Sequence, residues 1–437
     1  MADGYAVSSE KIWSDTIGKH KMFKSLTLNN WRQFNDVKIE FHPRLTVLTG
    51  ANGAGKTTIL HLLNRHWGWN IQYVSTPRIG SKHIRRYWAG FWRGTGSLTH
   101  EEETTVQHQI GKIEYRDHET ATLTIPGKVA ETFSVKIEPQ PNIAGVYVPS
   151  HRPLYLHQKV DQIPTQVDAR QQIFEVYLNE LRSRFNVNAR VQSPSHKLKQ
   201  SLISLATFGY ASQAVTPNKE ARETFEGFQN VLRIILPTSL GFRSIRINVP
   251  DVLLETATGD FSFDAVSGGV SALIDIAWQV YLYSFLAPEF VVIIDEPENH
   301  LHPELQQLIL PKLLEAFPKT QFIVATHNPF VVGSVPQSSV FVLRYNNDRK
   351  VDSVLLEQVN KAGTADEILR EVLGLHSTTA IWVADRLKKI IDRYSQGELN
   401  QNVLNSLREE LRQIGLEQHV PETLANIIDK TTNNDST

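Results

Sequence analysis

The chain has 437 residues and a formal net charge of −1, so its overall charge gives no argument for binding a polyanion, although a local basic patch is compatible with that average. It contains no cysteine, which excludes disulfides, thiolate metal sites and a cysteine nucleophile. Its hydrophobic content of 41% is enough to bury a sizeable core, in one large domain with insertions or in two or three smaller ones.

The first predicted elements are strands that alternate with turns within residues 20–49. They are expected at Met22–Leu28, Val37–Phe41 and Leu45–Thr49. Arg32, between the first two strands, could reach a nucleotide from the edge strand, and an ordinary solvated arginine fits the same pattern.

A glycine-rich loop, Gly50–Thr58, follows the third strand and fits the pattern G-x-x-x-x-G-K-[ST]. The residues after it read as the first turns of a helix. In such a loop the backbone N–H groups turn inward around phosphates, and the helix N-terminus adds positive partial charge. We predict a nucleoside triphosphate site in which Lys56 reaches the β- and γ-phosphates and the Thr57 hydroxyl ligates Mg²⁺. The other expected nucleotide contacts are Asn52, Gly53, Gly55 and Thr58.

Residues 65–93 combine seven aromatic and six cationic side chains and contain no acidic residue. Interleaved cations and aromatics could grip a nucleic-acid strand or a protein partner, with Arg85 and Arg86 as candidates. In the alternative interpretation the aromatic side chains pack against the rest of the protein and the cations are solvated.

The middle of the chain changes pattern twice. Short alternating runs predict an antiparallel meander over 104–138, and a further strand is expected at Gly145–Ser150. Helical spacing then dominates residues 166–236, and strands return from Ser244 to Phe263 with a turn at 258–260.

A second anion site is predicted at Val266–Ser271, where an apolar helix begins. It would use the Ser267 hydroxyl, the N–H groups of Gly268 and Gly269 and the helix N-terminus. A P-loop does not need such a site for its own phosphates, so its natural use is the nucleotide of a second subunit; a plain helix cap explains the string equally well.

The most apolar window, Leu273–Ile294, is interrupted by polar residues and reads as a buried helix followed by a buried strand. Residues 1–19 are polar and lack the apolar core of a signal peptide. We therefore expect a soluble, cytoplasmic protein without a membrane segment.

The strands Phe290–Ile294 and Gln321–Ala325 are continuously apolar, as in central parallel strands, and the helical stretch Pro303–Phe317 links them. Asp295 and Glu296 follow the first strand, where Asp295 can hold Mg²⁺ through water and Glu296 can orient the attacking water. His327 follows the second strand and could contact the γ-phosphate, with a structural histidine as the rival interpretation.

The last predicted elements are a hairpin, a helical region and a tail. The hairpin joins Val340–Leu343 to Val351–Leu356 around a turn at 346–348. A helical region is expected over 361–430, and a polar tail follows at 431–437.

In sequence order, Gly50–Thr58, Ser267–Ser271, Phe290–Glu296 and His327 resemble the Walker A, signature, Walker B and switch-histidine motifs of ABC-type ATPases. The stretches 26–34 and 295–303 are similar to the SMC, RecF and OLD-like branch rather than to transporters. The stretch 368–375 is similar to the tails of ATPase subunits of anti-phage defence systems. This resemblance covers about residues 20–360.

The resemblance implies an α/β fold: an ABC-type P-loop ATPase head with a mixed sheet, an antiparallel β subdomain, a helical insertion and a helical C-terminal region. It implies a homodimer or higher oligomer whose two heads sandwich two ATP molecules with Mg²⁺. Each site would use one chain's P-loop and the other chain's Ser267 segment. Closure of the heads would control a separate effector such as a nuclease. Two alternatives stay open: a RecF-like DNA-binding repair ATPase, and the ATP-binding subunit of a transporter.

Three features depart from the pattern of the family. Val270 and Ser271 follow the signature glycines, where transporters usually have glutamine. No glutamine stands in a loop that matches the Q-loop, and we place that loop near Pro149–Arg152 from the end of the preceding strand. The residues after 361 are too few, and lack the acidic pattern, for the Toprim nuclease of OLD enzymes. His300 and His302 could suggest a metal, but the resemblance places them in the loop that contacts the partner subunit.

Overall fold

The structure is a computed structural model of the chain, and it divides into two compact units, Met1–Ile368 and Leu369–Thr437. Residues 1–19 and 431–437, for which the sequence predicts polar segments, lie outside the described residues. The structure describes residues 21–79, 85–90, 107–152, 155, 157–164, 168–185, 193–210, 215–357, 363–372, 381–394, 401–417, 420–421, 423–425 and 427–428.

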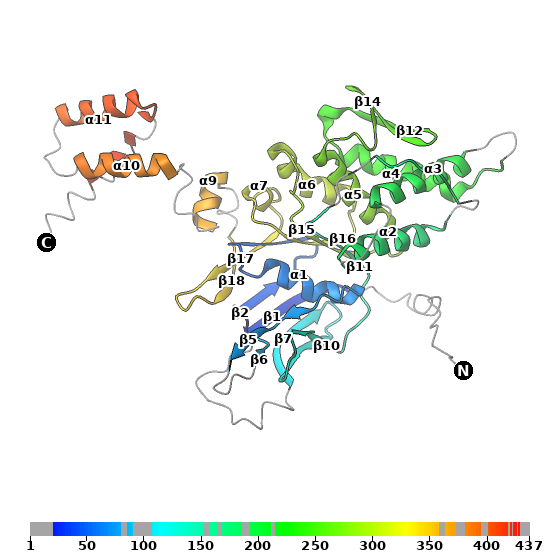
Figure 1. Cartoon of the computed structure of the whole chain (residues 1–437), viewed down its shortest axis with the longest axis horizontal. Coiled ribbons are helices and arrows are strands. Elements are labelled where there is room, and N and C mark those ends of the chain that lie inside the picture. Colours follow the sequence, from blue (N-terminus) through cyan, green and yellow to red (C-terminus); the bar gives the residue numbers. More distant parts are fainter. Residues whose placement is uncertain are drawn as a thin grey trace. The chain divides into compact units, whose positions relative to one another are not determined.

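A mixed sheet of 11 strands runs through the described part of unit 1 (Figure 1). Its strand order is β10-β8-β7-β1-β2-β18-β17-β3-β16-β15-β11, which places the glycine loop after a central strand. The strands are β1 (Phe23–Trp31), β2 (Phe34–Glu40), β3 (Leu45–Gly50), β7 (Gln107–Tyr115), β8 (Thr120–Pro126), β10 (Lys136–Glu138), β11 (Gly145–Val148), β15 (Phe290–Asp295), β16 (Thr320–Ala325), β17 (Ser339–Tyr345) and β18 (Val351–Leu355).

The strands from β17 to β11 pair in parallel, and every residue of β3, β15 and β16 is buried. This confirms the prediction that the unbroken apolar runs of β15 and β16 are central strands covered on both faces. Asp295 pairs with Ala325, and Ala325 pairs with Leu48. The carboxyl ends of the three strands therefore lie at one edge of the sheet, where ligands bind in open α/β folds.

The other half of the sheet is antiparallel. β1 pairs with both β2 and β7, and β7, β8 and β10 form a meander. The β17–β18 hairpin, which the sequence predicts, joins the two halves because β17 pairs in parallel with β3 and β18 pairs in parallel with β2. One hydrophobic core, which includes Phe34, Leu60, Ile113 and Ile293, runs through both halves.

Helices cover the parallel strands. Helix α1 (Lys56–Asn64) follows the glycine loop, and α6 (Pro303–Ala316) links β15 to β16 in the predicted βαβ unit. Figure 1 shows a group of further helices and a small sheet on one side of unit 1. This group contains α2 (Arg170–Phe185), α3 (Pro194–Gly209), α4 (Lys219–Ile235), α5 (Gly268–Tyr283) and the strands β12 (Phe242–Asn248), β13 (Asp251–Thr256) and β14 (Gly259–Ser262).

Helix α5 is buried over almost its whole length, and aromatic rings fix α4 against it. The ring of Phe228 on α4 lies 4.7 Å from that of Trp278 and 5.7 Å from that of Tyr281. The first pair is edge-to-face and the second is tilted, and aromatic pairs at these separations add to the burial that holds the two helices together. The remaining short elements of unit 1 are η2 (Arg65–Trp67), β4 (Tyr73–Val74), β5 (Thr76–Ile79), β6 (Arg85–Trp88), β9 (Thr132–Phe133), η3 (Thr238–Leu240), α7 (Pro329–Val332) and α9 (Ala365–Glu367).

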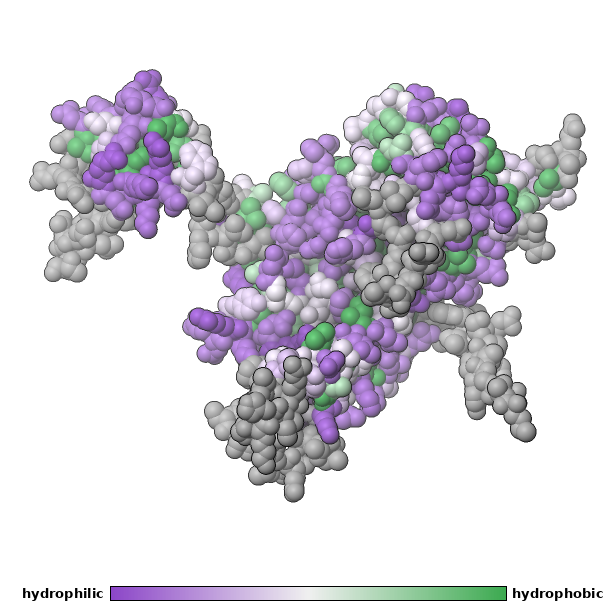
Figure 2. All heavy atoms as spheres, viewed as in Figure 1, coloured by the Kyte–Doolittle hydropathy of each residue, from purple (hydrophilic) through white to green (hydrophobic). Residues whose placement is uncertain are grey.

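Unit 2 contains the helices α10 (Ile381–Tyr394) and α11 (Gln401–Gln413) and begins within a short π-helical segment, η4 (Ile368–Val372). Its own apolar cluster includes Leu387, Ile390 and Leu407. Within the described residues, no helix of the protein is long and apolar enough to cross a membrane. The visible surface is mostly hydrophilic, with hydrophobic side chains scattered among the polar ones (Figure 2).

Candidate nucleotide site

Two positions of the glycine loop exclude a side chain both by their backbone conformation and by lack of space. Gly50 ends β3 at φ 135°, and a Cβ there would lie 2.3 Å from the Leu343 carbonyl oxygen of the neighbouring strand. Gly55 precedes α1 at φ 98°, and a Cβ there would lie 2.4 Å from the Phe34 ring. Both conditions exclude a side chain, so the chain can turn sharply from β3 into α1.

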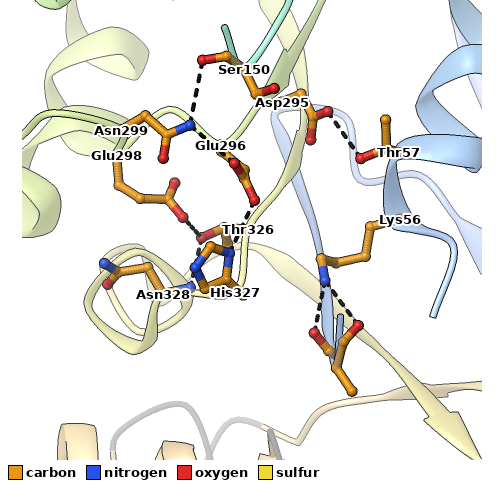
Figure 3. A network of polar contacts seen from close by, with 12 residues as sticks. Lys56, Thr57, Ser150, Asp295, Glu296, Glu298, Asn299, Thr326, His327 and Asn328 are labelled. Carbon is orange, nitrogen blue, oxygen red and sulfur yellow. Dashed lines mark hydrogen bonds and ion pairs between the residues drawn. The ribbon is translucent and has the colours of Figure 1, made fainter. Parts of the chain in front are cut away.

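Lys56, the first residue of α1, turns its side chain back into the loop. Its Nζ donates hydrogen bonds to the carbonyl oxygens of Gly50 (2.8 Å) and Ala51 (3.2 Å) (Figure 3). Burial lowers the pKa of this lysine, and the nearby carboxylates of Glu296, Asp295 and Glu298 act in the opposite direction. Phosphate oxygens are stronger acceptors than carbonyls because they carry charge.

Thr57 and Asp295, the two predicted metal ligands, lie against one another. The Thr57 hydroxyl donates to Asp295 Oδ2 at 3.0 Å (Figure 3). Burial raises the pKa of Asp295 to about 6, although the hydrogen bond from Thr57 and the charge of Lys56 lower it. A hydroxyl and a carboxylate suit Mg²⁺, which takes oxygen ligands and commonly completes its octahedron with water and substrate phosphates. The donor set therefore fits the metal that the sequence implies.

Glu296 is held by two neighbours and is still partly exposed. Its Oε1 lies 3.1 Å from His327 Nδ1, and its Oε2 accepts from the Asn299 amide at 3.0 Å. Its backbone adopts φ 48°, and its N–H donates to the Ala325 carbonyl. A carboxylate fixed this way at the edge of the sheet has the geometry of a group that polarises a water molecule.

His327, predicted to meet the γ-phosphate, contacts Glu296 in the structure. The imidazole is 51% exposed, and the Glu296 side chain is 30% exposed. Since the ring also faces solvent, it can orient Glu296 and still be reached by a ligand. The contact with Glu296 is a role that the sequence did not suggest.

Several polar residues next to the motifs complete the network in Figure 3. Glu298 is 4% exposed and accepts a hydrogen bond from the Thr326 hydroxyl, and burial raises its pKa. Asn328 caps α7 and donates to Gln306. These residues flank the Walker B and switch-histidine motifs, so their position in the sequence could have identified them.

Arg152 is a further residue of the site that the sequence does not reveal. It lies beyond the end of β11, where we expected a Q-loop, and it is 8% exposed. Its two terminal nitrogens donate to four carbonyl oxygens of the turn after β15, at distances from 2.8 to 3.5 Å. The acceptors are Asp295, Glu296, Pro297 and Asn299. One guanidinium therefore fixes the backbone that carries Asp295 and Glu296.

Ser267 caps α5, and its hydroxyl oxygen accepts from the Val270 N–H at 3.4 Å. A Cβ at Gly269 would lie 3.0 Å from the His300 carbonyl oxygen, so the start of α5 approaches the turn after β15. Within the described residues, Ser267 makes no hydrogen bond to residues 50–58. The protein therefore presents this serine on an exposed helix start.

The structure decides between the alternatives left open for two sets of residues. Arg32 packs against the segment around β4: it donates to the Val74 carbonyl at 2.6 Å, and its guanidinium lies 5.2 Å from the Tyr73 ring centre. In residues 65–93, Trp69 and Tyr73 belong to the hydrophobic core, and Trp67 packs against it. These aromatic side chains are therefore not available to stack on bases. The side chains of Arg85 and Arg86 lie outside the described residues.

The two histidines of the turn after β15 lie apart from any metal-binding cluster. Among the described residues, no group of three or more His, Asp or Glu side chains is placed to hold a metal ion. His302 stands at the N-cap position of α6, with φ −64° and ψ 149°, and His300 has φ 71°. Both contribute to the turn that leads from β15 into α6.

Comparison with known proteins identifies the type of domain. Residues 25–236 match a family model described as "AAA domain", and residues 253–333 match a second, described as "AAA domain, putative AbiEii toxin, Type IV TA system". The chain is 21% identical to the Septu protein PtuA of Bacillus mycoides over 90% of its own length. It is 24% identical to the OLD nuclease of Thermus scotoductus over 82% of its length and 69% of that protein.

The chain spans about half the length of the Septu proteins that it matches, 50% for the Bacillus mycoides protein and 52% for that of Bacillus thuringiensis. Among solved structures, the SMC head domain from Thermotoga maritima aligns with 77% of this chain and 99% of its own, with a TM-score of 0.40 and 15% identity.

Proposed function

Because this chain resembles the ATPases of the SMC, RecF and OLD-like branch, including those of defence systems, we propose that it binds and hydrolyses ATP and that ATP drives two copies of its head together. Association of the heads would hold or release a separate effector, such as a nuclease, in anti-phage defence. The named Septu and OLD relatives support this role, and the site supports the chemistry.

One observation carries the proposal: the Thr57 hydroxyl donates to the Asp295 carboxylate, and the Asp295 and Glu296 carboxylates both lie near enough to Lys56 to act on its charge. Lys56 would bind the β- and γ-phosphates, and Gly53, Gly55 and Thr58 would donate backbone N–H groups to them. Thr57 and Asp295 would hold Mg²⁺, which when bound neutralises the developing charge on the phosphates. Asn52, at the exposed tip of the loop, would contact the nucleotide from the other side.

Glu296 would orient the water that attacks the γ-phosphorus. Its two oxygens are fixed by His327 and Asn299, so the carboxylate would not need to reorganise during the reaction. His327 would report the presence of the γ-phosphate to Glu296 through their shared contact. In this arrangement Glu296 and His327 are the catalytic residues.

The exposed position of Ser267 supports a site shared between two chains. Its hydroxyl and the N–H groups of Gly268 and Gly269 stand at the N-terminus of a 16-residue helix, an arrangement that favours an anion. Since Ser267 does not contact its own glycine loop, we propose that it closes over the γ-phosphate of the nucleotide held by a second copy.

The experiment measures mass in solution by light scattering with ADP and with ATP. Glu296→Gln should accumulate a dimer in ATP, because the nucleotide is bound and its hydrolysis is slowed. Lys56→Ala should stay monomeric in both nucleotides, and Glu304→Gln, an exposed acid on α6, is the matched control that should behave as the unchanged protein. A Glu296→Gln protein that binds ATP and remains monomeric would overturn ATP-driven association.

A further inference from the structure

Lys199 places an ammonium group in the interior of the helical insertion. The residue lies on α3, and its side chain is 1% exposed. Its Nζ lies 2.5 Å from Asp264 Oδ2 and also donates to the Gln158 carbonyl oxygen. Buried charges are costly, so a lysine in this position requires its partner.

Asp264 depends on the same contact. Its side chain is 4% exposed, and its other carboxylate oxygen, Oδ1, has no hydrogen-bond partner. His157 is the second group at Oδ2, at 3.1 Å, but its ring is 64% exposed. Lys199 is therefore the buried cation that balances Asp264.

The position of Asp264 in the chain gives the pair its importance. It lies in the connection between β14, which ends at Ser262, and α5, which begins at Gly268. Phe263 beside it is fully buried, and its ring stacks on that of Tyr155. This connection ends at Ser267, three positions after Asp264, so an anchor at Asp264 fixes where the serine and the start of α5 are presented.

We propose that Lys199 is a positioning residue for the Ser267 segment. Its ion pair with Asp264 ties the start of α5 to α3, so a displacement of α3 would move the Ser267 hydroxyl and weaken the site that it offers to a second copy. Movement of the helical insertion, residues 166–236, would thereby strengthen or weaken ATP-driven association. This last step rests on the proposed function, whereas the anchoring of the segment is a property of the single chain.

The pair is better suited to positioning than an apolar contact would be. The Lys199 ammonium contacts both Asp264 and the Gln158 carbonyl, which fixes its position. A buried charge that loses its partner is strongly disfavoured, so any other position of the segment would cost free energy. The N-terminus of α3 is fixed as well, because Ser193 caps it and also donates to the Gln158 side chain. Gln158 thus contacts both the N-terminus of α3, through Ser193, and Lys199.

The test is amide hydrogen exchange on the nucleotide-free chain. Lys199→Met should raise the exchange rates of the Val270 and Ser271 amides by about tenfold or more, because these amides donate to Ser267. Amides of β3 and β15 should exchange as in the unchanged protein, which shows that the fold is intact. Lys219→Met, which removes a 90% exposed partner of Glu223 on α4, is the matched control and should change nothing.

Two further variants keep the test decisive if Lys199→Met does not fold. Asp264→Asn keeps the shape of the side chain and removes its charge, and it should also raise exchange at Val270 and Ser271. Lys199→Arg retains the charge and should restore part of the protection. Unchanged exchange at these amides in Asp264→Asn, with β3 and β15 protected, would overturn the proposal.

Turnover separates this inference from the proposed function. In Lys199→Met the affinity for ATP should stay the same while kcat falls by about tenfold, because the glycine loop is intact and the contribution of Ser267 is lost. If the unchanged protein hydrolyses ATP as a monomer, shared sites are disproved, and the exchange result still decides whether Lys199 anchors the segment. A fall in ATP affinity with unchanged kcat would contradict the role of Lys199.

Discussion

At the scale of single residues, Asp295 shows how burial acts on a predicted metal ligand. The residue is 4% exposed, and burial raises its pKa to about 6. An aspartate in an unfolded chain titrates near 3.9, so the folded chain binds the proton more tightly. The stability that this group contributes is therefore fully present below about pH 4 and is lost as the pH rises through about 6. A bound divalent cation would compensate for the buried charge.

Asp295→Asn should accordingly stabilise the protein at neutral pH. Without nucleotide and Mg²⁺, we expect its free energy of unfolding to exceed that of the unchanged protein by about 2–3 kcal/mol above pH 7, since the amide carries no charge to desolvate. The gain should shrink towards pH 4. Urea unfolding at several pH values measures it, and a gain of equal size at pH 4 and pH 8 would show that the buried charge is not its cause.

Arg152 shows the opposite case, a buried charge whose two terminal nitrogens donate to backbone oxygens. Arg152→Met would leave four carbonyls of the turn after β15 without this donor, so we expect a loss of about 2–4 kcal/mol of unfolding free energy. Arg152→Lys should recover only part, because an ammonium lacks the planar fork that reaches four acceptors. Arg243→Met, at an exposed arginine on β12, is the control and should change stability by less than about 0.5 kcal/mol in urea unfolding.

At the same scale, the sequence predicts the motif residues and misses their supports. Lys56, Thr57, Asp295 and Glu296 are recognisable because the chemistry of phosphate and Mg²⁺ fixes their types and spacing. Arg152 belongs to no such pattern, since it acts on carbonyl oxygens, which every residue has. Its contact with residues far along the chain exists only once β11 and β15 are paired.

At the scale of elements, local sequence patterns predict each strand and helix better than they predict which elements lie next to each other in the fold. The unbroken apolar runs of β15 and β16 and the helix between them are confirmed, as is the β17–β18 hairpin. The position of that hairpin between β2 and β3 is not predictable from its sequence, because it depends on parallel pairing with strands that are hundreds of residues earlier in the chain.

The contact between α4 and α5 rests on the aromatic packing of Phe228 against two rings of α5. Phe228→Ala should lower the free energy of unfolding by about 3–5 kcal/mol, because the ring is fully buried and its removal leaves a cavity beside Trp278 and Tyr281. Phe285→Ala provides the matched control.

Phe285 also packs on Tyr281, with ring centres 4.9 Å apart, but it is 37% exposed. Its removal should therefore cost clearly less than the removal of Phe228, since less apolar surface returns to water and the gap can fill with solvent. Equal losses for the two variants in urea unfolding would show that burial against α5 is not what makes Phe228 important.

At the scale of the whole molecule, the two anion sites of the chain pose a question of symmetry. The glycine loop and the start of α5 are both predicted to bind phosphate, and within the described residues they share no hydrogen bond. In a two-fold symmetric dimer, every contact from the first chain to the second is repeated from the second to the first. Ser267 of each chain can therefore complete the glycine-loop site of the other. Such an arrangement can be tested by mixing two inactive proteins.

Lys56→Ala and Ser267→Arg should each abolish turnover, the first because ATP is not bound and the second because the bulky cation occupies the position of the serine. A heterodimer of the two has one intact site, built from the glycine loop of the Ser267→Arg chain and the Ser267 segment of the Lys56→Ala chain. With random mixing, half of the dimers are of this kind, so an equimolar mixture should recover about a quarter of the phosphate-release rate of the unchanged protein. A double variant that carries both changes in one chain is the control: it should rescue neither single variant, since no mixture with it contains an intact site. If the mixture of the two single variants shows no more turnover than either variant alone, both halves of each site belong to one chain.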